Sequence, residues 1–149
     1  MWPILIGGAV ILFAGAAMSR RAKQRAAVAG LRRHFPGIAR MRLVAACPGL
    51  ADQLDDPMLA NLFDWIMTET YRRAGVAGFA ELMRWSVEHG DAQATAMVAE
   101  VARDAVDRLP APALAVLDGC GGRIFAGVML DDALSESGRR IGPELEKYV

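Results

Sequence analysis

The first 51 residues of this 149-residue chain contain no acidic side chain. Asp52 is the first of the 17 Asp and Glu residues, whereas eight of the 17 Lys and Arg residues lie within residues 1–43. The formal net charge of zero therefore hides a segment of +8 followed by a segment of −8. A charge split of this size indicates that one end of the chain meets a membrane or a nucleic acid.

The chain is also poor in the residues that carry most catalysis and metal binding. It has two histidines, His34 and His89, and two cysteines, Cys47 and Cys120, which are far apart in the sequence. Two cysteines make no disulfide framework and no zinc site on their own, so we expect reduced thiols in a cytoplasmic domain. No serine has the context of a catalytic nucleophile. The sequence therefore predicts no catalytic, cofactor-binding or metal-binding residue.

One glycine-rich loop and two acidic clusters are the alternatives to that prediction. Cys120 in the sequence GCGG would need a nearby base or a helix N-terminus to become a reactive thiol, and a small buried cysteine is the simpler interpretation. The acidic clusters could hold magnesium if they faced each other, but helix capping and a solvated surface explain them more simply. The clusters are Asp52, Asp55 and Asp56, and Asp131, Asp132 and Glu136.

Residues 2–18, WPILIGGAVILFAGAAM, contain no charged side chain. As a helix they would span about 25 Å, the short end of what crosses a bilayer, so we predict a transmembrane anchor over residues 1–19. A cleaved signal peptide would need basic residues before the apolar run, and here they follow it; a buried core helix is the other alternative. Gly8 and Gly15 would let another helix pack closely against the anchor.

A basic connector is predicted over residues 20–49, helical until Pro36-Gly37 ends or bends it. Basic residues beside a span stay in the cytoplasm, which predicts a bacterial-type plasma (inner) membrane protein with its N-terminus outside and its C-terminal domain cytoplasmic. We expect the connector to lie on anionic lipid headgroups of the lipid bilayer. A nucleic acid is disfavoured because no aromatic interleaving or recognition motif accompanies the charges. The predicted membrane-surface residues are Arg20, Arg21, Lys23, Arg25, Arg32 and Arg33.

Apolar residues at helical spacing predict an acidic, all-α domain of four or five short helices over residues 50–137. Asp55-Asp56-Pro57 opens its first helix, and Gly75 ends it. The glycines around Cys120 predict a break in the last part of the domain. Residues 138–149 are expected to be an exposed tail. The other predicted helices span about 77–89, 92–109 and parts of 113–137.

Trp65 and Trp85 lie away from the centres of the apolar stripes of their helices. A partly exposed tryptophan is typical of an interface anchor, whereas helices packed on both sides would bury it. We therefore predict a single-pass accessory or scaffold protein whose helical domain docks a protein partner, as a subunit of a larger membrane complex. The alternatives are a small membrane-anchored enzyme that uses the Cys120 loop or the acidic clusters, and a secreted domain with a cleaved leader.

Overall fold

The structure is a computed structural model that describes the backbone of residues 2–88 and 96–144. Side chains are described over the same ranges except at residues 2–21, 76–78 and 80–88. Over these ranges the chain is all-α and contains no strand, which confirms the all-α part of the predicted fold class. The elements are α1 (Trp2–Ala46), η1 (Pro48–Asp52), α2 (Asp56–Glu88), α3 (Ala96–Ala105), η3 (Val106–Arg108), α4 (Ala111–Asp118) and α5 (Gly122–Ile141), where η denotes a 3₁₀ helix.

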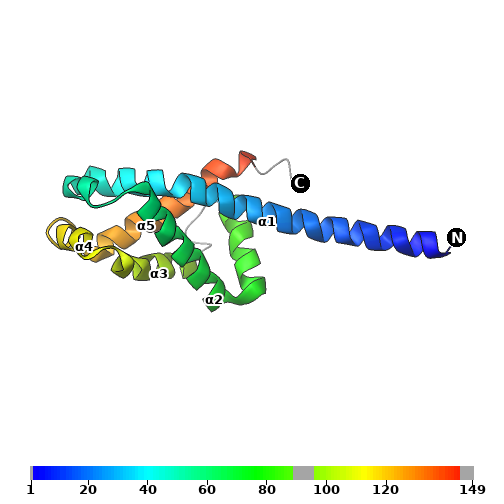
Figure 1. Ribbon diagram of the computed structural model, residues 1–149. Coiled ribbons are helices and arrows are strands. Elements are labelled where there is room, and N and C mark those ends of the chain that lie inside the picture. The colour runs from blue at the N-terminus through cyan, green and yellow to red at the C-terminus, as the bar shows by residue number, and fades with distance from the viewer. Residues whose placement is uncertain (1, 89–95, 145–149) are drawn as a thin grey trace.

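Helix α1 is 45 residues long and is the longest helix described. Its first part projects away from the other helices, whereas its second part lies beside α5 and α2 (Figure 1). Of the two predicted effects of Pro36-Gly37, an end or a bend, the structure contradicts the first, because α1 continues through Pro36 to Ala46. A proline inside a helix costs about 3 kcal/mol, and the burial of the apolar face around Pro36 offsets that cost.

The segment predicted as a basic connector, residues 20–49, supplies one side of the hydrophobic core. Its apolar residues recur along one face of the helix from residue 27 to residue 43, and six of them are at most 3 % exposed. The arginines occupy the remaining faces of the same helix. Residues 27–43 therefore supply a core face to the domain, a role that the sequence analysis did not predict for the connector. The six residues are Ala27, Leu31, Phe35, Ile38, Ala39 and Leu43.

The first half of α2 packs its predicted apolar stripe against α1. Phe63 is fully buried, and its ring centroid lies 5.6 Å from that of Phe35 on α1. Leu59 and Ile66 flank it and are also fully buried. The predicted cap of this helix is confirmed, since the backbone N–H of Met58 donates to Asp55 Oδ1 at 2.8 Å.

Gly75 interrupts α2 where the sequence predicted the end of a helix. Its backbone has φ 75° and ψ 178°, a conformation with positive φ that side chains disfavour. Helical structure resumes after this kink and continues to Glu88. The next predicted boundary, at His89 and Gly90, lies outside the described residues.

Helix α5 continues past the point where the sequence predicted an exposed tail. Ser137 and Gly138 are buried, and Ile141 is fully buried. The expectation of a tail from residue 138 was wrong because Gly30 on α1 leaves room for Ile141. A Cβ atom at Gly30 would lie 2.9 Å from Ile141 Cγ2, so the absence of a side chain allows the two helices to pack closely.

The break predicted near Cys120 is confirmed. α4 ends at Asp118 and α5 begins at Gly122, and the two helices are bent by 109° across this connection, which we call the elbow (residues 119–121). Where side chains are described, no single helix is long and apolar enough to cross a membrane, and only α4 and α5 taken together meet the criteria of length and composition. The predicted anchor at residues 1–19, with Gly8 and Gly15, lies outside the residues whose side chains are described.

Candidate functional site

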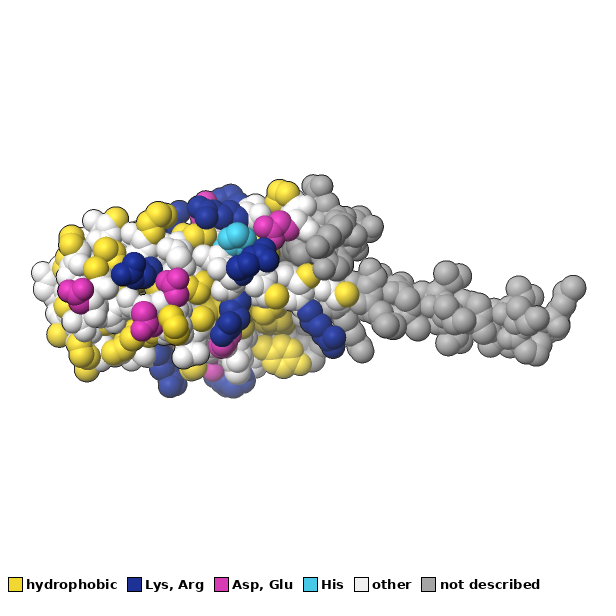
Figure 2. Space-filling model, turned by 45° about the horizontal axis from the view of Figure 1, so that its top comes forward, with side chains coloured by type: hydrophobic (Ala, Val, Ile, Leu, Met, Phe, Trp, Pro, Cys, Tyr) yellow, Lys and Arg dark blue, Asp and Glu magenta, His cyan; other side chains and the backbone are white. Residues whose placement is uncertain are grey.

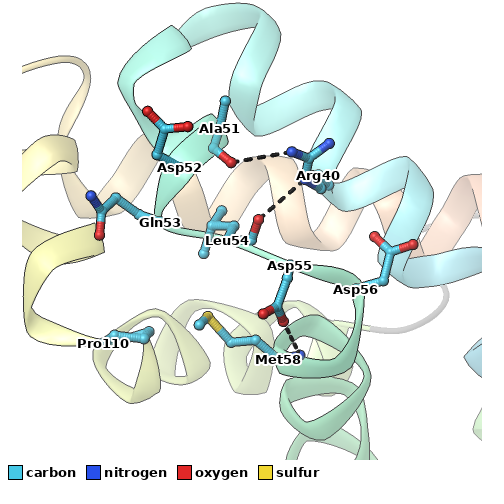
Figure 3. A pocket seen from close by; sticks show the side chains of 9 residues that line it. All are labelled: Arg40, Ala51, Asp52, Gln53, Leu54, Asp55, Asp56, Met58 and Pro110. Atoms are coloured by element: carbon cyan, nitrogen blue, oxygen red, sulfur yellow. Dashed lines mark hydrogen bonds between the residues drawn. The ribbon is translucent and has the colours of Figure 1, made fainter.

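A hollow in the described part of the chain lies between α1, η1 and the start of α2, and its volume is about 660 Å³. Arg40 on α1 projects into it and donates from Nε to the carbonyl oxygen of Leu54 at 3.2 Å and from Nη2 to that of Ala51 at 3.1 Å (Figure 3). These bonds join α1 to η1 at Ala51 and to the turn that follows η1 at Leu54. The residues lining the hollow are Arg40, Ala51, Asp52, Gln53, Leu54, Asp55, Asp56, Met58 and Pro110.

The first acidic cluster, Asp52, Asp55 and Asp56, lines this hollow, but one of its carboxylates already caps a helix. Asp55 Oδ1 accepts the backbone N–H of Met58, while Asp52 and Asp56 are exposed. Among the described residues, no group of three His, Cys, Asp or Glu side chains is placed to hold a metal ion. Asp55 therefore serves as a helix cap, and the other two carboxylates of the cluster face solvent.

The second acidic cluster lies on α5 and does not line the hollow. Glu136 accepts hydrogen bonds from Arg139 and Arg140, which lower the pKa of its carboxyl group. Asp132 lies 3.9 Å from Arg42 on α1. Asp131 is only partly exposed, and burial together with the neighbouring charge of Asp132 raises its pKa. The two acidic clusters do not share one site: the first lines the hollow, and the second lies on α5 along its contact with α1.

Cys47 and Cys120 are joined by a disulfide bond, with their Cα atoms 5.9 Å apart. This corrects the expectation of two reduced thiols. Cys47 at the end of α1 is fully buried, whereas Cys120 in the elbow is exposed, so the interpretation of Cys120 as a small buried cysteine was also wrong. The pairing was missed because 73 residues separate the two cysteines. The available signal was that each cysteine stands at the end of a helix next to Gly or Pro.

Two of the predicted membrane-surface residues form ion pairs within the domain. Arg32 donates from Nε and Nη2 to the two carboxylate oxygens of Asp64 at 2.9 and 3.1 Å, which joins α1 to α2 and raises the pKa of Arg32. Arg33 pairs with Glu144, just beyond α5. The remaining four lie nearer the N-terminus: Lys23 is partly exposed, Arg25 is exposed, and the side chains of Arg20 and Arg21 are outside the description.

Trp65 is the one predicted interface tryptophan whose side chain is described. It is partly buried and packs against the core, and the guanidinium carbon of Arg108 lies 4.9 Å from its ring centroid. A cation over an indole ring is an attractive contact, so Trp65 lies between the core and Arg108 rather than standing free. Trp85 lies among the residues whose side chains are not described.

Exposed apolar side chains on α1 and α5 are a surface feature that the sequence analysis did not single out. Ile124 is 83 % exposed, and Val128 one turn later is 43 % exposed. Met41 on α1 is 59 % exposed. Figure 2 shows hydrophobic side chains toward the end of the molecule opposite the N-terminus, with most charged side chains on this face nearer the middle. The sequence signal for this exposed surface was the apolar run on α5, which is too broad to be buried as one stripe. Phe125 and Met129 pack on the core, whereas Ile124 and Val128 do not.

A scan of protein-family models, a search of curated proteins and a search of solved structures each found no match to this chain.

Proposed function

We propose that this chain is a single-pass, membrane-anchored accessory or scaffold protein whose helical domain docks a protein partner within a larger membrane complex. In this proposal α1 has two roles, since its first part is the anchor and its second part is the central helix of the domain. The observation that carries the proposal is the continuity of α1 from Trp2 to Ala46.

The projecting part of α1 supports the anchor. Figure 1 shows no other helix beside it, and an isolated helix without tertiary contacts is only marginally stable in water. The apolar sequence of residues 2–18 would be stable in lipid, where a helix satisfies all of its own backbone hydrogen bonds. A bilayer around this segment accounts for both its sequence and its position.

The basic residues beside the proposed span support a cytoplasmic domain. Arg20, Arg21, Lys23 and Arg25 follow the apolar run directly. Positive charge next to a span is retained on the cytoplasmic side. The same four side chains would contact anionic headgroups, whereas Arg32 and Arg33 are engaged with acidic residues of the domain.

Exposed apolar side chains support the docking role. Ile124 and Met41 present hydrophobic surface to solvent at the end away from the proposed anchor, and such surface is typical of contacts between proteins when it forms a patch. We therefore assign partner contact to Ile124 and Val128, and we keep Trp65 and Trp85 as predicted contact residues.

Membrane insertion and orientation are tested with C-terminal fusions of the full-length chain to alkaline phosphatase and to green fluorescent protein. We expect the fusions to remain in the membrane pellet after alkaline carbonate washing, with fluorescence but no phosphatase activity. Recovery in the supernatant would refute the anchor. Phosphatase activity in the pellet would refute the orientation alone.

Docking is tested by purifying the tagged chain in mild detergent and identifying the proteins that remain bound. Ile124→Glu should abolish the binding of a stoichiometric partner, because the substitution places a charge in the exposed apolar surface. Thr68→Glu adds the same charge at an exposed position on α2 and should leave the partner bound. Retention of every partner by the Ile124 variant, or failure of the wild-type chain to bind one, would contradict the docking role.

A further inference from the structure

The elbow between α4 and α5 is fastened to the end of α1 by one covalent bond. Cys47 follows the last residue of α1 and precedes η1, and Cys120 lies between Gly119 and Gly121. The disulfide therefore connects three elements at one corner of the molecule: α1, η1 and the elbow. We call this corner the tied corner.

Apolar packing also holds the tied corner, since Leu50 of η1 is fully buried, but this packing is thinnest along α4. α4 has eight residues, and only Ala113 and Leu117 of them are buried. Leu114 and Val116 are only partly buried against the core, and Val116 lies so close to Gly49 of η1 that a Cβ atom there would be 3.1 Å from Val116 Cγ1. The ion pairs of Arg123 at the elbow join exposed side chains and contribute little.

The rest of α5 is held independently of the disulfide. From Ala126 onward it contributes buried residues on every turn, and it packs against α1 and α3. Opening of the disulfide would therefore loosen residues 110–121 and leave residues 126–141 in place, since local stability follows local burial.

We infer that Cys47 and Cys120 form a reversible dithiol–disulfide pair that fastens and releases the tied corner. The inference rests on the proposed cytoplasmic orientation, because a disulfide in that compartment is usually transient and regulatory. The unequal exposure of the two sulfur-bearing residues supports it: Cys120 is accessible to another thiol, and exposed disulfides are the labile ones. Gly119 and Gly121 on either side give the backbone freedom to move when the bond opens.

The exchange partner is a dithiol, such as a dithiol oxidoreductase. Its thiolate attacks the sulfur of Cys120, a mixed disulfide forms, and Cys47 leaves as a thiolate that takes up a proton. The second thiol of the dithiol then attacks the mixed disulfide and releases Cys120 as a thiol. Two electrons and two protons pass from the dithiol to the cysteine pair, and the dithiol becomes a disulfide; the reverse reaction closes the bond.

The release is tested on the purified full-length chain in mild detergent, using hydrogen exchange in the oxidised state and after reduction with dithiothreitol. We expect amide exchange over residues 110–121 to rise at least tenfold on reduction, and exchange over residues 126–141 to change less than twofold. Cys120→Ser should show the fast pattern without reductant, and dithiothreitol should not change it. Absence of the disulfide in the oxidised protein, uniform exchange changes along the chain, or no change at residues 110–121 would overturn the inference.

The reversible state is tested in cells by acid quenching and alkylation with a mass-labelled maleimide. We expect both cysteines to be alkylated in growing cells and protected after treatment with the thiol oxidant diamide, with protection lost again on recovery. Full protection in untreated cells would overturn reversibility. The phosphatase and fluorescence fusions then distinguish the two causes of full protection: an opposite orientation of the domain, which would refute the proposed orientation as well, or a permanent disulfide in the cytoplasm.

Discussion

Gly127 on α5 lies so close to α3 that a single methyl group has no room. A Cβ atom built there would be 2.9 Å from Arg103 Cγ and 3.1 Å from Arg103 Cα. The Cγ atom can move with the side chain, but the Cα atom can move only if the backbone of α3 moves. Gly127→Ala should therefore push α3 and α5 apart.

Two opposing contributions set the size of this effect. Overpacking a close contact costs about 1–3 kcal/mol, and replacing glycine by alanine inside a helix contributes about 1 kcal/mol in favour of folding. We expect Gly127→Ala to lower the free energy of unfolding by about 1–2 kcal/mol, because backbone resists displacement more than a side-chain terminus does.

Gly37→Ala is the matched control. Gly37 also lies inside a helix, but it is exposed, and a Cβ atom added there would have no neighbouring atom within 4 Å. Only the helix contribution remains, so this variant should be more stable than the wild type by about 0.5–1 kcal/mol. If the two Gly→Ala substitutions change the free energy of unfolding in opposite directions, the difference comes from the packing around each glycine.

The measurement is urea unfolding of the full-length chain in mild detergent, followed by circular dichroism at 222 nm. The free energies of unfolding are compared only between variants that have the same m-value, the slope of the free energy against urea concentration. A stabilised Gly127→Ala variant, or equal shifts for both variants, would refute the close approach of α3 and α5.

Three further predictions concern the core, the pH dependence and the surface. Phe35→Ala removes a fully buried ring that packs on Phe63, and it should cost about 3–5 kcal/mol in urea unfolding. Hydrogen bonds from two neighbouring arginines lower the pKa of Glu69 from 4.5 to about 2. The resulting stabilisation is complete above pH 4.5 and is lost as the pH falls toward 2. In an acid titration of stability, Glu69→Gln should therefore lose less stability over this pH range than the wild type. Arg32→Gln breaks an exposed ion pair with Asp64 and should leave the midpoint of urea unfolding almost unchanged, because exposed ion pairs contribute little to stability; a clear fall in the midpoint would mean that the pair is shielded from solvent.

Local signals in the sequence predicted much of the second half of the fold. The Asp55 cap, the stripe that includes Phe63 and the break at Gly75 depend on residues within one or two turns of each other. Capping, helical periodicity and glycine conformations act at that range. The elbow around Cys120 was predicted for the same reason.

The features that the sequence did not predict depend on contacts between distant segments. The core role of Phe35 follows from its contact with α2, and the helical continuation to Ile141 follows from the space at Gly30. Local residues argued against both, since basic side chains surround Phe35 and glycines flank Ile141. The pairing of Cys47 with Cys120 needed the whole fold to bring their helix ends together.

If the first part of α1 is the proposed anchor, the unbroken backbone of α1 would fix the rotation of the domain about the axis of that anchor. Only residues 20–26, about two helical turns, separate the predicted span from Ala27, the first buried core residue, and they contain no loop that would act as a swivel. Each residue inserted there would turn the domain by about 100° and raise it by about 1.5 Å. The direction in which Ile124 faces, viewed along the membrane normal, would thus be set by the number of helical residues between the proposed span and the domain. A partner held in the same bilayer would bind only when that rotation presents Ile124 to it.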